Sequence, residues 1–287
     1  MVKLCLLIIQ LLWMSHGFAA QDSLKFEKFE YGLSFESRSL FGFKLYKNGP
    51  FKNRRAVLLS EGIHGNEYLG LLDRLVSLEE LPEEFQSFVN SGGVLLVIPQ
   101  VNPDGVYRKN RYSSFGTDLN RDFRVSRLQM QETHQLSKWV ESELKQLEAQ
   151  LVLAVDYHCC VGALLYPDSE ESQAPELFKR YYQEITSMAQ SSISSKITSG
   201  VTKDFFEKET FGTLKDYWFK KYAAISFTFE APVMDASKLM FDQQVGWWGN
   251  LLNYVGKLPA TEMLAIQSNK KPDGQHSVEV KPIGYSE

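Results

Sequence analysis

Four short apolar runs, separated by segments with helical spacing, constrain the fold of this 287-residue chain more than any other feature. Runs of this length and uniformity are typical of strands that are buried on both faces of a sheet. They lie at residues 56–60, 94–99, 151–156 and 223–229. Amphipathic helical spacing is found at 68–78, 127–147, 176–190 and 239–255. We therefore predict a single-domain α/β fold, with a mixed, mainly parallel sheet and helices on both faces.

The N-terminal segment has the features of a signal peptide. Lys3 supplies a positive charge, and the apolar run 4–14 is interrupted only by Gln10. This run is shorter than the about 20 residues that span a bilayer, and small residues follow it at Gly17 and Ala19. We expect residues 1–19 to be cleaved and the protein to be exported, to a periplasm or out of the cell, with no membrane span left. An uncleaved anchor and a buried first helix are the alternatives.

The remaining chain carries little information in its bulk composition. The formal net charge is −4, which gives no general attraction to nucleic acid. We expect residues 20–266 to form one catalytic domain, 267–287 to be a polar tail, and the protein to be a monomer. Residues 26–46, where aromatic and polar residues alternate loosely, predict a strand or hairpin. Cys159 and Cys160 are neighbours and cannot join distant parts of the fold, so the core must hold it together.

One group of residues at the predicted strand ends could bind zinc. His64 and Glu67 follow the first apolar run, and His158 follows the third. Zinc accepts imidazole nitrogen and carboxylate oxygen, and a catalytic zinc commonly has three protein ligands and one water. A bare His-x-x-Glu also arises often by chance, so His64 and Glu67 could be a surface pair and His158 a core histidine.

Further motifs follow the other strands in a defined order. They are 102–105 (Asn-Pro-Asp-Gly), 107–111 (Tyr-Arg-Lys-Asn-Arg), 118–123 (Asp-Leu-Asn-Arg-Asp-Phe) and 227–230 (Phe-Thr-Phe-Glu). Together with the histidine motif, this ordered set resembles the zinc metallocarboxypeptidase family, the carboxypeptidase A/B-like or funnelin fold. The opening segment 31–34 with Arg38, and 164–167 after His158, also match.

The resemblance implies a metal centre and a catalytic base. By resemblance, His64, Glu67 and His158 bind one Zn²⁺ per chain, which lowers the pKa of its water toward about 7 and polarises the scissile carbonyl. Glu230 matches the family's catalytic glutamate, which takes the proton of the water and passes it to the leaving amine.

The resemblance also implies how a peptide is held. Arg108 matches the arginine that stabilises the developing oxyanion. Asn120 and Arg121 match the pair that binds the terminal carboxylate of the substrate, since a guanidinium can hold a carboxylate through two parallel hydrogen bonds. The implied partner is a peptide with a free carboxylate end.

Two positions depart from the family pattern. The family's loop tyrosine should fall at 205–210, where this sequence has none. Lys215 aligns with the floor of the specificity pocket, where a cation would favour an acidic substrate residue. The alternative is a solvated helix lysine. Cys159 or Cys160 could bind zinc in principle, but structural packing fits the pair better.

The predicted function is therefore a zinc-dependent exopeptidase that cleaves next to a free C-terminal carboxylate and prefers acidic side chains if Lys215 lies in the pocket. The main alternative is a murein peptide amidase or carboxypeptidase that acts at the γ-D-glutamyl–diaminopimelate bond. A related zinc deacylase would not need Asn120 with Arg121, and a non-catalytic module would not need Glu230.

Overall fold

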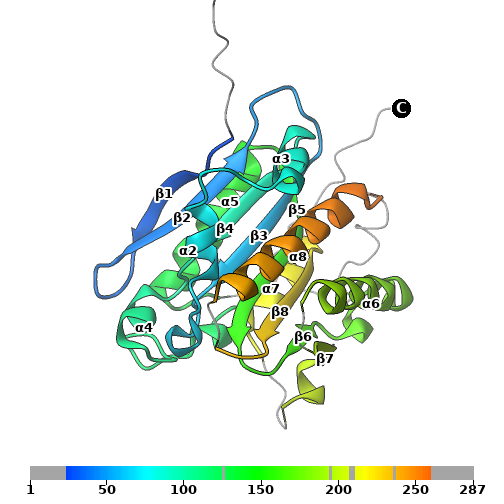
Figure 1. The fold of residues 1–287 in the computed structure, drawn as a ribbon. Helices are drawn as coiled ribbons and strands as arrows, with labels where there is room; N and C mark the ends of the chain where they lie inside the picture. The colour runs from blue at the N-terminus through cyan, green and yellow to red at the C-terminus, as the bar shows by residue number, and fades with distance from the viewer. Residues whose placement is uncertain (1–23, 125–126, 194–195, 207–210, 235–236, 260–287) are drawn as a thin grey trace, which may run out of the picture.

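A computed structural model describes residues 24–124, 127–193, 196–206, 211–234 and 237–259. The predicted signal segment 1–19 and tail 267–287 lie outside these ranges. Within them, eight strands form one mixed sheet in the order β1-β2-β4-β3-β5-β8-β6-β7 (Figure 1). The strands are β1 (Glu27–Leu33), β2 (Ser39–Tyr46), β3 (Arg54–Glu61), β4 (Val94–Ile98), β5 (Ala149–Cys159), β6 (Ala163–Tyr166), β7 (Thr198–Val201) and β8 (Ile225–Ala231).

The middle of the sheet is parallel and its margins are antiparallel. Strands β4, β3, β5 and β8 run parallel to one another. The hairpin predicted at 26–46 forms as β1 and β2, and β2 pairs antiparallel with β4. At the other margin β6 is antiparallel to β8 and parallel to β7. Because the parallel strands end at the same edge, the residues that follow β3, β5 and β8 are brought together there.

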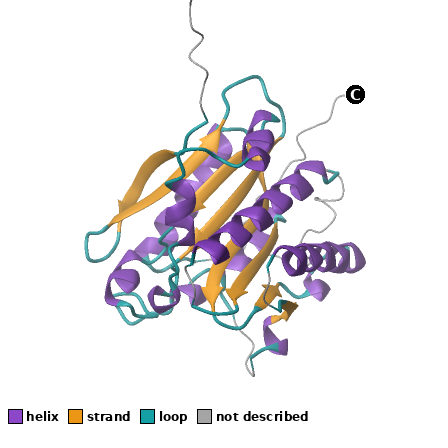
Figure 2. Ribbon diagram, viewed as in Figure 1, coloured by secondary structure: helices purple, strands orange, loops and turns teal. Residues whose placement is uncertain are grey.

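Helices cover both faces of the sheet, as predicted (Figure 2). The core cluster on one face includes residues of α2, α3, α6 and α8, and the cluster on the other face includes residues of α5 and α7. The bounds are α2 (Leu71–Val76), α3 (Glu83–Asn90), α4 (Pro103–Arg108), α5 (Gln131–Gln146), α6 (Pro175–Ser192), α7 (Leu214–Tyr222) and α8 (Lys238–Lys257). Short 3₁₀ turns are η1 (Gly65–Glu67), η2 (Leu119–Arg121), η3 (Ser169–Glu171) and η4 (Thr202–Asp204). The predicted α/β fold, a mixed sheet with helices on both faces, is confirmed.

Three expected boundaries are wrong for local reasons. The helix expected at 68–78 is only α2, because Gly70 takes a left-handed φ of 72° immediately before it. The helix expected from residue 127 begins at Gln131, since the Asp122 carboxylate accepts the backbone N–H groups of Gln129 and Met130 and holds that segment outside the helix. The last strand begins at Ile225, because Ala223 has φ 56° where α7 ends.

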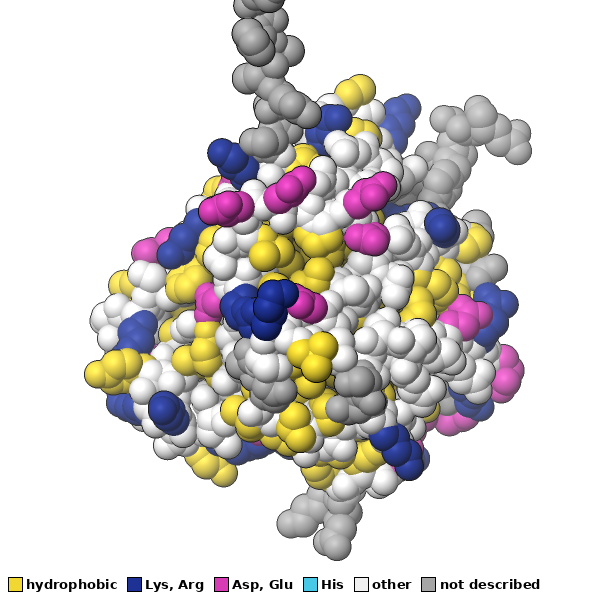
Figure 3. Space-filling model, in the orientation of Figure 1, with side chains coloured by type: hydrophobic (Ala, Val, Ile, Leu, Met, Phe, Trp, Pro, Cys, Tyr) yellow, Lys and Arg dark blue, Asp and Glu magenta, His cyan; other side chains and the backbone are white. Residues whose placement is uncertain are grey.

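The surface gives few further constraints. On the face drawn in Figure 3, acidic and basic side chains are interspersed between apolar patches. Among the helices of the described residues, none combines the length and the apolar character that a bilayer span requires.

Candidate metal centre and substrate pocket

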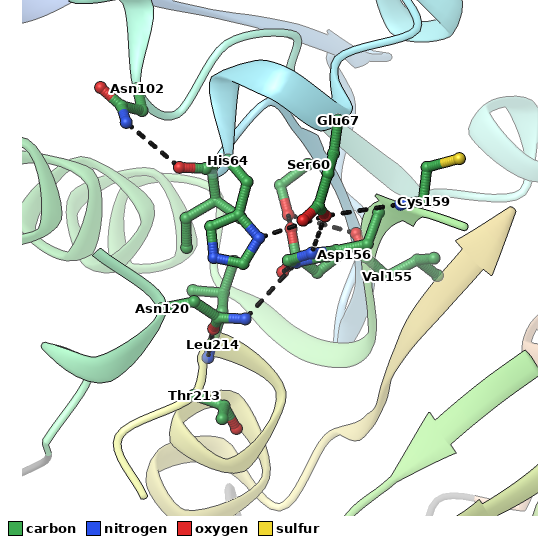
Figure 4. A network of polar contacts seen from close by, with 12 residues as sticks. Ser60, His64, Glu67, Asn102, Asn120, Val155, Asp156, Cys159, Thr213 and Leu214 are labelled. Carbon is green, nitrogen blue, oxygen red and sulfur yellow. Dashed lines mark hydrogen bonds and ion pairs between the residues drawn. The ribbon is translucent and has the colours of Figure 1, made fainter. Parts of the chain in front are cut away.

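The three predicted zinc ligands come together at the carboxyl edge of the sheet. His64 follows β3, Glu67 ends η1 and His158 lies near the end of β5, and one ligand atom of each lies within 4.8 Å of the others. Glu67 Oε2 lies 3.1 Å from His64 Nδ1 and 2.9 Å from His158 Nδ1. Figure 4 shows the Glu67 side chain pointing toward the His64 ring. Two imidazole nitrogens and a carboxylate oxygen therefore face one small volume.

The loop that carries His64 and Glu67 is held closely against its neighbours. A Cβ at Gly65 would lie 1.9 Å from the carbonyl carbon of Gly105, so only glycine fits there. The Gly65 N–H donates to the carbonyl of Asn110 at 3.0 Å, and the Asn102 side chain donates to the Ile63 carbonyl at 3.2 Å. The segment 102–105 thus has a structural role: it supports the first half of the ligand loop.

Each histidine has a carboxylate on the side away from Glu67. His64 Nε2 lies 3.0 Å from Asp118 Oδ1, and His158 Nε2 lies 2.7 Å from Asp156 Oδ2. A carboxylate only accepts hydrogen bonds, so these partners place a proton on each Nε2 and direct Nδ1 toward the centre. Sequence analysis missed both partners. The signal for Asp156 was its spacing from His158, because alternate residues of a strand share a face.

The electrostatics of the cluster suit a cation. Burial raises the pKa of Glu67, but the neighbouring His158 and His64 rings outweigh burial and lower it. Burial lowers the pKa of His158, and the neighbouring Asp156 charge more than reverses this. Imidazole and carboxylate groups bind a metal in their deprotonated forms, so zinc binding by these residues would be favoured at higher pH.

The donor set fits a zinc ion on a further observation. His64 Nδ1 is buried and makes no hydrogen bond within the described residues, although Glu67 Oε2 is near it. A buried polar atom of this kind calls for a partner. Zinc accepts this combination of imidazole and carboxylate donors, and His64, Glu67 and His158 are the residues that would hold it.

Glu230 lies beside the metal centre on the next strand. In the β5–β8 register it is the direct partner of His158, and both line the same pocket. Its exposed fraction is 7%. Burial, the largest influence, raises the pKa of the Glu230 carboxyl, the charge of His158 opposes this, and Glu67 adds to the rise. Such a carboxylate is suited to accept a proton.

The structure does not bring Arg108 to this pocket. Arg108 is the last residue of α4, its side chain is 43% exposed, and it contacts Glu36 and Ser114. The chain reverses at Lys109, which has φ 53°, and Arg111 then points to the metal centre.

Arg111 is the arginine at the pocket. Its guanidinium lies 2.9 Å from Glu67 and 2.9 Å from Asp118, and its side chain is 33% exposed. Both arginines belong to the segment 107–111, and sequence spacing alone did not separate them. The turn at Lys109 decides which of them faces the metal ligands.

The predicted carboxylate-binding pair lies next to the metal centre. Asn120 and Arg121 belong to η2 and line the pocket. The Asn120 side chain accepts the N–H of Leu214 at 2.9 Å, and its Nδ2 lies 3.5 Å from His158 Nε2. Asn120 thus joins the metal centre to the start of α7. In Figure 4, Asn120 and Thr213 lie on the opposite side of the centre from Cys159.

Lys215 is not a solvated helix lysine. Its exposed fraction is 5%, and it lines the pocket from the first turn of α7. The ammonium donates to Asp216 Oδ1 at 2.7 Å, and this carboxylate is its side-chain partner among the described residues. The cation predicted at the pocket floor is therefore in the pocket, with a carboxylate beside it.

The whole pocket encloses about 710 Å³ and has polar and apolar parts. The polar part includes the residues described above. Apolar side chains, among them Val161, Leu165 and Phe206, complete the lining. This volume is ample for the end of a peptide chain.

With this geometry in view, the chain can be compared with known proteins. The family model for zinc carboxypeptidases matches residues 13–244. The chain belongs to the zinc carboxypeptidase family. The predicted family membership is thereby confirmed.

Curated relatives of this family member match only part of it. Carboxypeptidase 2 of Trichophyton rubrum is 32% identical over 128 residues, which is 43% of this chain and 22% of that protein. Carboxypeptidase 2 of Trichophyton tonsurans is 30% identical over 127 residues, again 22% of that protein. The matched region thus spans about a fifth of the length of these relatives.

Solved structures of the family show the same fold at low identity. Bovine thrombin-activatable fibrinolysis inhibitor, solved with a tick carboxypeptidase inhibitor, has a TM-score of 0.62 at 17% identity, over 81% of this chain and 91% of that one. A metallo-carboxypeptidase of Burkholderia cenocepacia has a TM-score of 0.63 at 13% identity, over 82% of this chain and 67% of that one. At these identities the likeness concerns the fold.

The segment of the missing loop tyrosine and the cysteine pair can also be located, the first of them in part. Residues 207–210 of the segment expected to hold the family's loop tyrosine lie outside the described residues, and Phe205 and Phe206 line the pocket. Cys159 and Cys160 form a disulfide with each other and also line the pocket. Neither cysteine belongs to the metal-binding group found in the described residues.

Proposed function

We propose that this protein is a zinc-dependent carboxypeptidase that hydrolyses the peptide bond next to a free C-terminal carboxylate. The observation that carries the proposal is the convergence of His64, Glu67 and His158 with Glu230 beside them. Family membership supports the same activity. A zinc ion held by the three ligands would supply Lewis-acid polarisation of the scissile carbonyl and of a water.

The residues around the metal would divide the reaction between them. Glu230 would accept the proton of the attacking water on its carboxylate and donate it to the leaving amine. Its buried setting, which raises the pKa, brings the carboxyl closer to the range in which it can serve as both base and acid. Arg111, rather than Arg108, would stabilise negative charge on the carbonyl oxygen of the substrate.

Asn120 and Arg121 would bind the substrate's terminal carboxylate. The guanidinium of Arg121 can form two parallel hydrogen bonds with a carboxylate. Asn120 is held in place through Leu214, so its amide would be presented in a fixed orientation. Binding of this kind would restrict hydrolysis to the chain end.

Lys215 would give this carboxypeptidase a preference for acidic C-terminal side chains. The lysine is buried in the pocket, and an ammonium has three donors, of which one is directed to Asp216. The other donors could bind a substrate carboxylate. Asp216 reduces the net positive charge, so the expected preference is a matter of direct hydrogen bonding rather than of a long-range field.

The test measures how fast the zinc-loaded protein hydrolyses a set of matched peptides. Peptides ending in Glu, Phe and Glu-amide are incubated separately, and released amino acids are quantified. We expect the Glu peptide to be cleaved fastest, the Phe peptide more slowly and the amide not at all. Equal cleavage of the amide would contradict the exopeptidase assignment, and faster release of Phe would contradict the acidic preference. Murein tripeptide as a fourth substrate tests the cell-wall alternative.

We also propose that the protein is exported after cleavage near residue 19. The support is the charged and apolar pattern of the first residues of the sequence. N-terminal sequencing of the protein recovered from outside the cytoplasm is the test. A mature protein that still begins at Met1 would contradict it.

A further inference from the structure

Glu61, the last residue of β3, is a buried carboxylate that the proposed reaction does not use. Its exposed fraction is 0%. Its Oε1 accepts the backbone N–H groups of Leu69 at 2.7 Å and Gly70 at 2.8 Å, and its Oε2 accepts that of Leu72 at 3.0 Å. One side chain thus satisfies three backbone donors at the start of α2, two of them buried, which would otherwise need other partners.

These bonds close the loop that carries two of the three metal ligands. The loop leaves β3 at Glu61, passes through His64 and Glu67, and returns at Leu69 to the Glu61 carboxylate. Its first half is supported separately, by the contacts of Gly65 and Ile63 with Asn110 and Asn102. Glu61 therefore holds the half of the loop that contains Glu67.

The buried site disfavours the charged form of the Glu61 carboxyl. Burial raises its pKa to about 7, against the three backbone hydrogen bonds, and the charge of Asp73 adds to the rise. Burial raises the pKa of Tyr157, whose hydroxyl accepts a hydrogen bond from Trp248, and the Glu61 charge adds to this rise. A carboxylate in such a site is tolerated because its hydrogen bonds are directional and complete.

We infer that Glu61 is a positioning residue of the metal centre: by bonding Leu69, Gly70 and Leu72 it fixes the loop so that Glu67 meets His64 and His158. The inference rests on the proposed zinc site but not on the proposed reaction. Among the described residues, the hydrogen bonds of this side chain go to Leu69, Gly70 and Leu72 and not to a metal ligand. Its influence would therefore appear first in metal affinity.

The experiment measures zinc affinity by competition with a chromophoric chelator, without any substrate. Glu61→Gln keeps the shape but replaces one acceptor oxygen by an amide that cannot accept an N–H. We expect its zinc affinity to be about 10- to 100-fold weaker than that of the wild type, as for other changes behind a metal ligand. Glu143→Gln is the matched control, because Glu143 on α5 is also a buried carboxylate, and among the described residues its ion-pair partner is Lys44. Its zinc affinity should stay within about threefold of the wild type.

The outcomes separate the inference from the proposed function. A wild type that binds zinc, with Glu61→Gln equally tight or both variants equally weakened, would overturn the positioning role alone. A wild type that binds no zinc would overturn the proposed metal centre and this inference with it.

A second measurement on the unaltered protein covers the case in which Glu61→Gln does not fold. Hydrogen exchange in the metal-free wild type should show slow exchange of the Leu69 and Leu72 amides. Both N–H groups donate to Glu61, so their protection should not require a bound metal. Exchange of these amides as fast as in an exposed loop would overturn the inference.

Discussion

The two ends of the pocket are built differently. At the metal end, each ligand comes from a strand end or from a turn beside one, and each histidine has a second carboxylate behind it. At the other end, Asn120, Arg121 and Lys215 lie on a short 3₁₀ turn and on the first turn of α7. Hydrogen bonds and ion pairs link the residues of the metal end to one another. At the other end, Asn120 bonds Leu214 and Lys215 bonds Asp216, both on α7.

This difference has a consequence for function. A change at the metal end should disturb several partners at once, because Glu67 alone contacts both histidines and Arg111. A change at the other end should alter which substrate is preferred and leave the metal in place. The predictions below test this division, in order of decreasing effect.

Glu230→Gln should give the largest loss, because it removes the proposed proton acceptor and keeps the size of the side chain. We expect kcat to fall by about 10²- to 10⁴-fold with zinc content unchanged. Steady-state kinetics and zinc quantification on the same preparation check this. A variant as active as the wild type would contradict the mechanism.

Arg111→Ala should reduce kcat by about 10²- to 10³-fold, because the arginine beside the metal ligands is the proposed oxyanion donor. Arg108→Ala is the matched control in the same segment and should change kcat by less than about threefold, since Arg108 is exposed and outside the pocket. If Arg108→Ala is the more damaging change, Arg108 and not Arg111 stabilises the oxyanion.

Lys215→Met should change preference rather than catalysis. Because a hydrogen bond to a charged group contributes about 1.5–3 kcal/mol, kcat/KM for a peptide ending in Glu should fall about 10- to 100-fold. The value for a peptide ending in Phe should rise. Lys221→Met on the same helix is the control, because Lys221 bonds Glu141 and Tyr217 instead of lining the pocket. Parallel losses for both peptides would argue against a specificity role.

Thr213→Ala should have the smallest effect. Thr213 is the N-cap of α7 and accepts the Asp216 N–H, so its loss should lower the free energy of unfolding by about 1 kcal/mol. Ser237→Ala removes the corresponding cap of α8 and should cost a similar amount. We expect only Thr213→Ala to raise KM. Denaturation curves and steady-state kinetics of both variants check this. An unchanged KM for Thr213→Ala would show that the start of α7 tolerates movement.

Much of this arrangement was predictable from the sequence. The apolar runs at 56–60 and 151–156 identified β3 and β5, and polar residues directly after buried parallel strands must meet at one edge of the sheet. That argument made a shared site for His64, Glu67 and His158 possible, and the family resemblance assigned them as its ligands. The helices α3 and α7 were not predicted, because each is short and mixes apolar and charged residues.

Side-chain direction was beyond reach of the sequence. The position of Arg111 depends on the left-handed turn at Lys109, and the burial of Lys215 depends on how α7 packs against the sheet. The partnership of Glu61 with Leu69 to Leu72 likewise requires the loop to have closed.

The sequence by itself thus determined the layer structure and which residues converge on the candidate metal centre, because hydrophobic periodicity and the succession of strands along the chain can be read in one dimension. Only the tertiary structure decided which arginine faces the ligands, whether the pocket lysine is solvated, and which buried carboxylates stand behind the histidines. The physical reason is that these depend on backbone turns and on contacts between residues far apart in the chain, where a change of one turn reverses the direction of a side chain.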